Sequence, residues 1–247
     1  MQTGFFIAGV AGQTGQKKMD VVAHNLANAT TPGFVGSHLA FRTALTQKLA
    51  LHTNRNITPG AYATEGSTFV DLSPGAPHYT GNPLDFAIVG DGWFKVQVAP
   101  GQVAYTRAGN FRLDANGNLL TADGKPVLDA TDAPITLPPG DIAADNNGNL
   151  YVNKQRVATL GIVKIQDASK VQRIGHARVY TPLANVTPAG PDVAVHQGQI
   201  TGSNVNSVMT MVEMMTITRN NQGLMKLIEQ YNHVASLLAE QVGRVQG

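Results

Sequence analysis

Cysteine is absent from the 247 residues, which excludes disulfide scaffolds, zinc fingers, other thiolate metal sites and cysteine nucleophiles. Charged residues make up only 14% of the chain, and 18 basic against 16 acidic residues leave a net charge of +2. So small an excess, without a cluster of Lys and Arg, is not typical of nucleic-acid binding or of a polybasic membrane anchor. No segment reaches the roughly 18 apolar residues that a membrane-spanning helix needs, so we predict no direct membrane insertion.

Proline divides the chain into regions of different character. All 13 prolines lie between Pro32 and Pro191. Because proline breaks helices and is tolerated in turns and at sheet edges, this distribution predicts helical ends around a non-helical middle. We expect an α+β fold: an antiparallel β-rich central domain, a barrel or a sandwich, with N- and C-terminal α-helices that pair as a coiled coil. The expected regions are a helix in residues 1–35, an extended connector in 36–82, the β-rich domain in 83–181, a return connector in 182–202 and a helix in 203–247.

An apolar stripe with several small residues marks the N-terminal helix. Its members recur at steps of four and three, the spacing of a heptad-like helix face. They are Ala8, Gly12, Gly15, Met19, Val22 and Leu26. Pro32 and Gly33 follow the stripe and predict the end of the helix. The first residues lack the basic region of a secretory signal peptide, so we interpret them as part of the mature protein.

The C-terminal stripe is longer and more regular. Its members recur at alternating steps of three and four, and Asn221 is the one polar residue among them. They are Met214, Ile217, Asn221, Leu224, Ile228, Tyr231, Ala235, Leu238 and Val242. With Ser203 or Asn204 as the N-cap, a helix to Val242 would be roughly 58 Å long at ~1.5 Å per residue. A second apolar strip lies in its first half, so that one strip can face a partner within the chain and the other something else. The second strip consists of Val205, Val208, Val212 and Met215.

Short apolar segments separated by turn residues fill the middle of the chain. Two of the turns contain Asn-Gly, which supplies the positive φ that tight hairpins require. We predict three hairpins and two further strands, as in an antiparallel barrel or sandwich. The hairpins pair 84–89 with 93–98, 111–113 with 119–121, and 142–144 with 150–152, and the further strands cover 158–165 and 178–180.

No motif in the sequence indicates catalysis or metal binding. The two Asn-Gly turns resemble the start of a calcium loop, but the twelfth position holds Lys125 in one and Arg156 in the other, where a bidentate Glu is needed. Asp85 and Asp91 flank an apolar strand and are better explained as residues that begin a strand and close a turn than as a catalytic pair. The seven histidines show no zinc-ligand spacing. We therefore predict that the protein is not an enzyme, and we assign it no catalytic, cofactor-binding or metal-binding residue.

The C-terminal helix is too long for one chain to cover. It overshoots a β domain of about 100 residues, whose radius of gyration is roughly 13 Å, and the N-terminal helix is only about 33 Å long. We therefore expect the ends of an isolated chain to be disordered and to become ordered when neighbouring subunits cover them. The methionines near the start of the C-terminal helix fit either an adaptable core or an interface with non-identical neighbours. The expected subunit-interface residues are Met19, Val22, Leu26, Val208, Val212, Met215, Ile217, Leu224, Ile228, Tyr231, Leu238 and Val242.

Three ordered signatures extend over nearly the whole chain. The first is Met19–Phe34, which includes Asn25-Leu26-Ala27-Asn28 and Pro32-Gly33-Phe34; the second runs from 81–94 to 105–111, and the third is 198–206. Together they resemble the flagellar axial proteins, the family of rod, hook and hook-associated proteins. Within the family, the short length and the sequence Gly92-Trp93-Phe94 resemble a proximal-rod protein more than they resemble the close relative of that protein. One departure is the stretch 219–223, Arg-Asn-Asn-Gln-Gly, where relatives usually carry an Arg-Ala-Tyr-Glu-like sequence.

The resemblance implies a structural subunit in the rod of the bacterial flagellar basal body, which crosses the periplasm and transmits motor torque to the hook. It implies partners among other rod proteins and copies of the same chain, and export by the flagellar type III apparatus without a cleaved signal peptide. The terminal helices would pack into the inner tube of the rod, with the β domain outside. Three alternatives remain open: a distal-rod or hook protein of the same family, a secreted β-domain carbohydrate-active enzyme, and an adhesin.

Overall fold

The computed structural model describes residues 2–40, 42–45, 61–64 and 67–245. The chain falls into two compact units, each described by itself below. The helical unit comprises Met1–His24, Leu39–Thr68 and Val208–Gly247, and the β-rich unit comprises Asn25–His38 and Phe69–Ser207.

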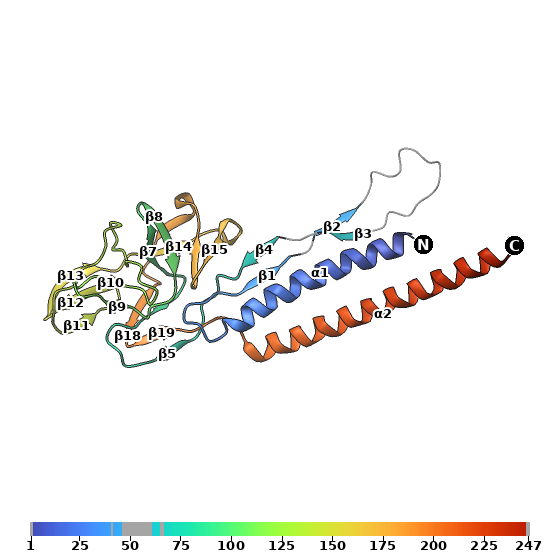
Figure 1. Ribbon diagram of the computed structural model, residues 1–247. Coiled ribbons are helices and arrows are strands. Elements are labelled where there is room, and N and C mark those ends of the chain that lie inside the picture. Colours follow the sequence, from blue (N-terminus) through green and yellow to red (C-terminus); the bar gives the residue numbers. More distant parts are fainter. Residues whose placement is uncertain (1, 41, 46–60, 65–66, 246–247) are drawn as a thin grey trace. The chain divides into compact units, whose positions relative to one another are not determined.

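Two long helices dominate the helical unit (Figure 1). Helix α1 spans Gln2–Ala27 and helix α2 spans Ser207–Val245, and the two run antiparallel. The predicted pairing of the terminal helices is therefore confirmed. Strands β2 (Arg42–Leu45) and β3 (Ala61–Thr64) form an antiparallel pair in the same unit. Neither α1 nor α2, over the residues described, is long and apolar enough to cross a membrane.

A six-stranded antiparallel sheet is the largest element of the β-rich unit. Its strand order is β15-β16-β8-β7-β14-β17. The strands are β7 (Trp93–Ala99), β8 (Gln102–Thr106), β14 (Ile162–Ile165), β15 (Gln172–Gly175), β16 (Arg178–Tyr180) and β17 (Val186–Pro188). Side chains alternate between the two faces of a strand, and both faces of this sheet are covered. At the start of β7, Trp93 belongs to one buried apolar cluster and Phe94 to the other.

Smaller sheets complete the unit. The three-stranded sheet consists of β11 (Ile142–Ala144), β12 (Asn149–Val152) and β13 (Gln155–Thr159). The two-stranded pairs are β1 (Ser37–Leu39) with β4 (Thr68–Val70), β5 (Pro77–Tyr79) with β19 (Gln199–Thr201), β6 (Phe86–Val89) with β18 (Ala194–Gln197), and β9 (Arg112–Leu113) with β10 (Leu119–Leu120). Two 3-10 turns cover Ala168–Lys170 and Leu183–Asn185. The predicted antiparallel β-rich centre is confirmed.

Two of the three predicted hairpins are confirmed, and one is wrong. The register pairs Leu119 with Leu113, and Ala144 with Leu150, across the two Asn-Gly turns. Strands β6 and β7 do not pair, because β6 takes β18 as its partner and β7 lies between β8 and β14. Gly90, at φ +99°, turns the chain out of the β6–β18 pair, and a Cβ atom at this position would lie 2.8 Å from the Asp192 carbonyl oxygen. Gly90 thus allows the chain to pass from the β6–β18 pair to β7 of the six-stranded sheet.

Both ranges expected to be extended connectors contain paired strands. Within 182–202, β17 joins the edge of the six-stranded sheet and β18 pairs with β6. Within 36–82, β5 pairs with β19 through His78 and Ile200. The predicted strand 178–180 is observed as β16, whereas 158–165 is divided between the end of β13 and β14.

Candidate assembly interface

The facing sides of α1 and α2 form a partly buried seam. Val22 of α1 and Ile217 of α2 are 4% and 5% exposed. The Lys18 ammonium lies 2.9 Å from the Glu213 carboxylate beside the seam. Asn221 faces Gly15, since a Cβ atom added to this glycine would overlap the Asn221 side-chain oxygen. These contacts pair the two helices through the stripes that the sequence predicts.

The opposite face of α2 is apolar and exposed over its first turns. At 100° per residue, Val208, Met211, Val212 and Met215 lie on one side of the helix, and Ile217 lies on the other. Their exposed fractions are 67%, 47%, 54% and 61%. We call these four residues the outer strip. Large apolar side chains at such exposure on one face are typical of a surface that a partner covers.

The residues expected at the subunit interface fall into four groups. Val208, Val212 and Met215 are exposed on the outer strip, whereas Val22 and Ile217 are buried. Met19, Leu26, Leu224 and Ile228 are partly buried. The side chains of Tyr231, Leu238 and Val242 lie outside the described part of the structure.

Further exposed apolar residues on α2 were missed by the sequence reasoning. Met225, Leu227, Val234 and Leu237 are between 48% and 59% exposed. Leu227 and Val234 are seven residues apart, a heptad step that could have marked them. Val205, which the second strip was expected to include, precedes α2 and is half-buried beside Gly36.

The predicted N-cap of α2 is wrong, because the helix begins at Ser207 and the candidate asparagine has other partners. The Asn204 carboxamide oxygen accepts from the Gly36 amide at 2.7 Å, and its NH2 donates to the Asp71 and Ser73 carbonyls at 3.1 Å. Asn204 therefore joins the segment before α2 to the segments around β1 and β4.

A second signature asparagine acts in the same way. The NH2 group of Asn25, which is 6% exposed, donates to the Ser37 carbonyl at 2.7 Å. Its side-chain oxygen accepts from the Ser37 amide at 3.0 Å. The Gly33 amide also donates to the Thr201 carbonyl at 2.8 Å. The N- and C-terminal signatures are thus joined by hydrogen bonds within the β-rich unit.

Arg107 connects the two halves of the middle signature. Its side chain is 2% exposed, its Nε donates to the Gly92 carbonyl at 3.1 Å, and its guanidinium lies 4.5 Å from the Trp93 ring centroid. Burial lowers the pKa of Arg107 to about 10, although the carboxylates of Asp91 and Asp71 act in the opposite direction. The cation–π contact and the hydrogen bond hold the start of β7 against the segment after β8.

The two loops that resemble calcium loops use their carboxylates as hydrogen-bond acceptors. Asp114 accepts from the amides of Asn116 and Asn118 at 2.8 Å, and these bonds, foremost those from Asn118, lower its pKa. Burial raises the pKa of Asp145, but the bonds that it accepts from Asn149 and Asn147 outweigh burial and lower the pKa overall. The carboxylates close the hairpin turns, as expected of plain turns.

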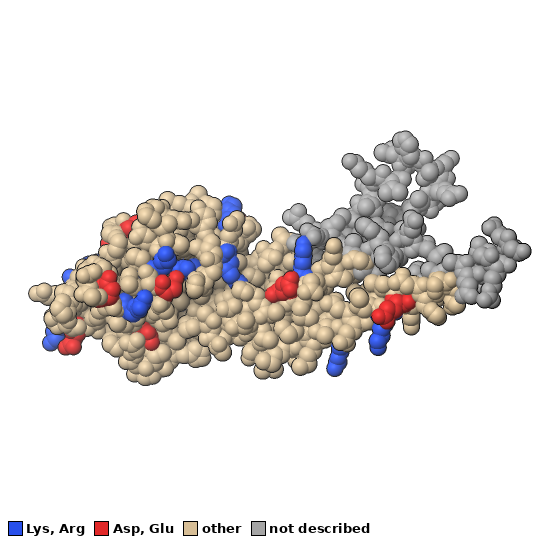
Figure 2. Space-filling view, viewed as in Figure 1, with Lys and Arg blue, Asp and Glu red and all other residues tan. Residues whose placement is uncertain are grey.

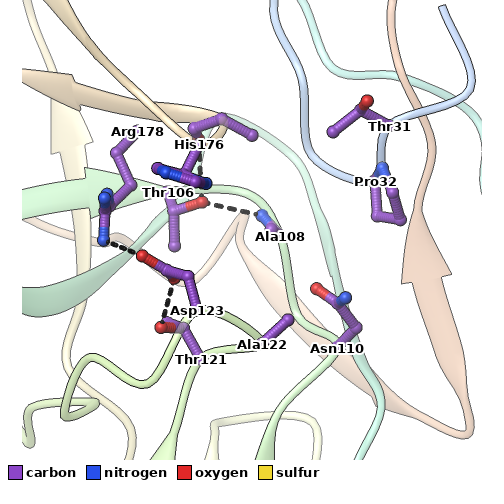
Figure 3. Close-up of a pocket in the computed structure, with 11 residues that line it drawn as sticks. Thr31, Pro32, Thr106, Ala108, Asn110, Thr121, Ala122, Asp123, His176 and Arg178 are labelled. Carbon is purple, nitrogen blue, oxygen red and sulfur yellow. Dashed lines mark hydrogen bonds and ion pairs between the residues drawn. The ribbon is translucent and has the colours of Figure 1, made fainter. Parts of the chain in front are cut away.

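A cavity of about 140 Å³ lies in the β-rich unit (Figure 3). Thr31 and Pro32 form one wall, and Asp123 and His176 lie across from them. Asp123 accepts from Thr121 at 2.7 Å and from the Arg178 guanidinium at 2.5 Å. Asp123 is the one carboxylate among the residues that line this cavity, whereas glycoside hydrolysis needs two facing carboxyl groups. The arrangement does not support the carbohydrate-active alternative.

Charge is mixed over the β-rich unit. On the face shown in Figure 2, its Lys and Arg side chains lie among Asp and Glu side chains and form no patch of one sign. Lys164 is 3.3 Å from Asp91, and Lys95 is 2.8 Å from Asp132. This face therefore does not show the basic stripe that nucleic-acid binding requires.

Comparison with known proteins places these features in one family. Models described as "Flagella basal body rod protein", "Flagellar hook protein FlgE/F/G D1 domain" and "Flagellar basal body rod FlgEFG protein C-terminal" match residues 7–34, 87–165 and 196–239. The flagellar basal-body rod protein FlgF of Rhizobium meliloti is 36% identical over 223 residues, 89% of this chain and 89% of that protein. FlgF of Escherichia coli is 37% identical over 236 residues, 89% of this chain and 90% of that protein.

The chain belongs to the flagellar basal-body rod proteins of the FlgF type. FlgG proteins are more distant: that of Bacillus subtilis is 30% identical over 244 residues, 90% of this chain and 92% of that protein. The family is structural and non-enzymatic, which confirms the prediction that this rod protein is not an enzyme. Membership also implies assembly with other rod proteins.

Proposed function

We propose that the chain is built into the basal-body rod through its terminal helices and that it transmits torque from the motor toward the hook. Its partners are copies of itself and other rod proteins. The observation that carries this proposal is the outer strip of α2, which is exposed while the seam behind it is covered by α1. A helix pair that buries one apolar face and leaves a second one open is suited to lateral packing against further helices.

The size of the outer strip is sufficient for a useful contact. Fully burying a Val or Met side chain stabilises by about 1.5–3 kcal/mol, so covering four side chains that are roughly half exposed contributes about 3–7 kcal/mol. Such a contact is weak for one pair of chains and becomes effective when each subunit has several neighbours. Two methionines in the strip, Met211 and Met215, let it adapt to neighbours that are not identical.

The strip is tested by placing a charge on it. We expect Val212→Asp to abolish swimming and incorporation into isolated basal bodies, because a carboxylate would be buried in an apolar contact. Asn220→Asp, an exposed polar position on the same helix, is the matched control and should leave both unchanged. Helicity and thermal stability of the purified Val212→Asp chain should remain those of the wild type. Normal incorporation of a folded Val212→Asp chain would reject the proposal.

We further propose that the chain reaches the rod in the periplasm through the flagellar type III apparatus, with its N-terminus intact. The support is the resemblance to the flagellar axial proteins, which implies this route, and the sequence of α1, in which Gly4, Gly9 and Gly12 interrupt the apolar residues. Mass spectrometry of the chain recovered from basal bodies should find the peptide that contains Gln2 and Thr3. A mature chain that starts inside α1 would contradict this route.

A further inference from the structure

Among the seam residues of α2 whose side chains the structure describes, Asn221 is the one that is polar, and α1 has a glycine opposite it. A Cβ atom added to Gly15 would overlap the Asn221 side-chain oxygen and would lie 3.2 Å from its Cγ. The carboxamide therefore occupies the space that a side chain at position 15 would need. Gly12, one step along the same α1 stripe, has nothing within 4 Å of the corresponding position. The match is thus specific to Gly15.

The rest of the seam offers little to distinguish one helix partner from another. The other described seam residues of α2 are apolar and are buried or partly buried, namely Met214, Ile217, Leu224 and Ile228. Apolar seams with heptad spacing pair with any similar seam, and an assembly of related helices contains many. The Lys18–Glu213 ion pair is about 40% exposed on both sides and contributes little selectivity.

We infer that Asn221 and Gly15 form a specificity pair, which directs the seam of α2 to an α1 helix rather than to a second α2 and leaves the outer strip free for neighbours. Opposite Met19 or Val22, or opposite the seam of a second α2, the carboxamide would meet a large apolar side chain. Burial of an amide against such a side chain is costly. Asn221 is thus tolerated opposite Gly15 and destabilises the other pairings. A single buried Asn selects among partners in coiled coils in the same way.

This inference concerns partner choice in the purified chain and does not depend on the rod role. A cysteine-free sequence makes the test simple, since every disulfide is an introduced one. In the register defined by Gly15 and Asn221, Met19 lies level with Ile217 because both are four residues away along antiparallel helices. A chain with both Met19→Cys and Ile217→Cys should form the bridge within one chain. The chain with Ile217→Cys alone reports pairing of α2 with a second α2.

The decisive comparison is made with and without Asn221→Leu. We expect little interchain disulfide from the Ile217→Cys chain with Asn221, and an increase of about fivefold or more with Asn221→Leu, because the seam is then apolar throughout. Circular dichroism confirms that each chain keeps its helices. Equal interchain disulfide in the two backgrounds would overturn the inference, as would failure of the double-cysteine chain to bridge internally when Asn221 is present.

A second variant tests the glycine side of the pair. Gly15→Ala and Gly12→Ala raise the helix propensity of α1 equally, but only Gly15→Ala adds a methyl group where the Asn221 carboxamide lies. We expect Gly15→Ala to reduce the fraction of chains bridged internally between positions 19 and 217, and Gly12→Ala to leave it unchanged. The same yield from both variants would show that Gly15 does not accommodate Asn221.

Discussion

Arg107 shows how single residues join segments that are distant in the sequence. Its Nε donates a hydrogen bond to the Gly92 carbonyl oxygen, and its guanidinium stacks on the Trp93 ring. The sequence marks this arginine only as part of a signature, because neither the burial of a cation nor its aromatic partner can be deduced from local pattern. Asn25 and Asn204 are similar, since their partners lie 12 and 168 residues away.

Gly33 is the glycine whose replacement we expect to be most damaging. Its φ is +66°, and a Cβ atom would overlap the backbone of Ala108. Gly101 has a similar φ of +74° but open space around it, so it provides a matched control. We expect Gly101→Ala to cost about 1 kcal/mol from the backbone alone, and Gly33→Ala to cost at least about 2 kcal/mol more because of the overlap. Chemical denaturation of the two variants measures the difference, and equal losses would contradict it.

We expect Asp145 to make the free energy of unfolding depend on pH in the acid range. Hydrogen bonds hold the folded-state pKa of Asp145 below its unfolded value, so its contribution is complete above about pH 4 and is lost as the pH falls through the folded pKa. Asp145→Asn should therefore lower the free energy of unfolding by about 1 kcal/mol at pH 7, a figure that allows for solvent screening. The difference from the wild type should shrink toward zero near pH 2. Urea titrations at both pH values test this, with the exposed Asp141→Asn as the control. A difference that persists in acid would show that the carboxylate charge is not responsible.

Secondary-structure elements whose cause is local were predicted well. Both Asn-Gly hairpins and both terminal helices follow from turn residues and periodicity within the element itself. The β6–β7 hairpin was wrong because the partner of β6 is β18, more than 100 residues away, and the connectors contain strands for the same reason. At the candidate interface, the spacing of apolar residues in α2 predicted which side is covered by α1 and which forms the outer strip. The position of Val205 and the start of α2 could not be predicted, because they depend on tertiary contacts with Gly36.

The middle of α2 contains Gly223, a residue of low helix propensity. Nothing lies within 4 Å of the position that a Cβ atom would take. Gly223→Ala should therefore stabilise α2 by about 1 kcal/mol through helix propensity alone. Circular dichroism should show higher helicity, and trypsin should cleave α2 more slowly after Lys226. The open, non-helical Gly101→Ala is the control and should change neither. A loss of helicity in Gly223→Ala would mean that α2 needs the glycine for its path.

At the scale of the whole molecule, the two units differ in how their stability is supplied. The β-rich unit buries two apolar clusters on either side of its main sheet. In the described part of the helical unit, α1 and α2 cover one seam, and most other described apolar side chains of α2 are about half exposed or more. Regions with few buried apolar contacts open at low free energy, so the helices should be far less protected than the sheet. Stability of the helical unit then depends on what covers the outer strip.

Hydrogen exchange on the isolated chain and on the chain within purified basal bodies tests this dependence. In the isolated chain we expect amides of α1 and α2 to exchange quickly while residues 84–180 resist, because neighbouring helices are needed to make up the missing burial. In the basal body the same helices should become protected, with the largest change around Val208, Val212 and Met215. The Val212→Asp chain, measured alone, is the control and should behave as the wild type does. Slow exchange of both helices in a chain shown to be monomeric would contradict the expectation that the ends become ordered on assembly, because the helical unit would then be complete without neighbours.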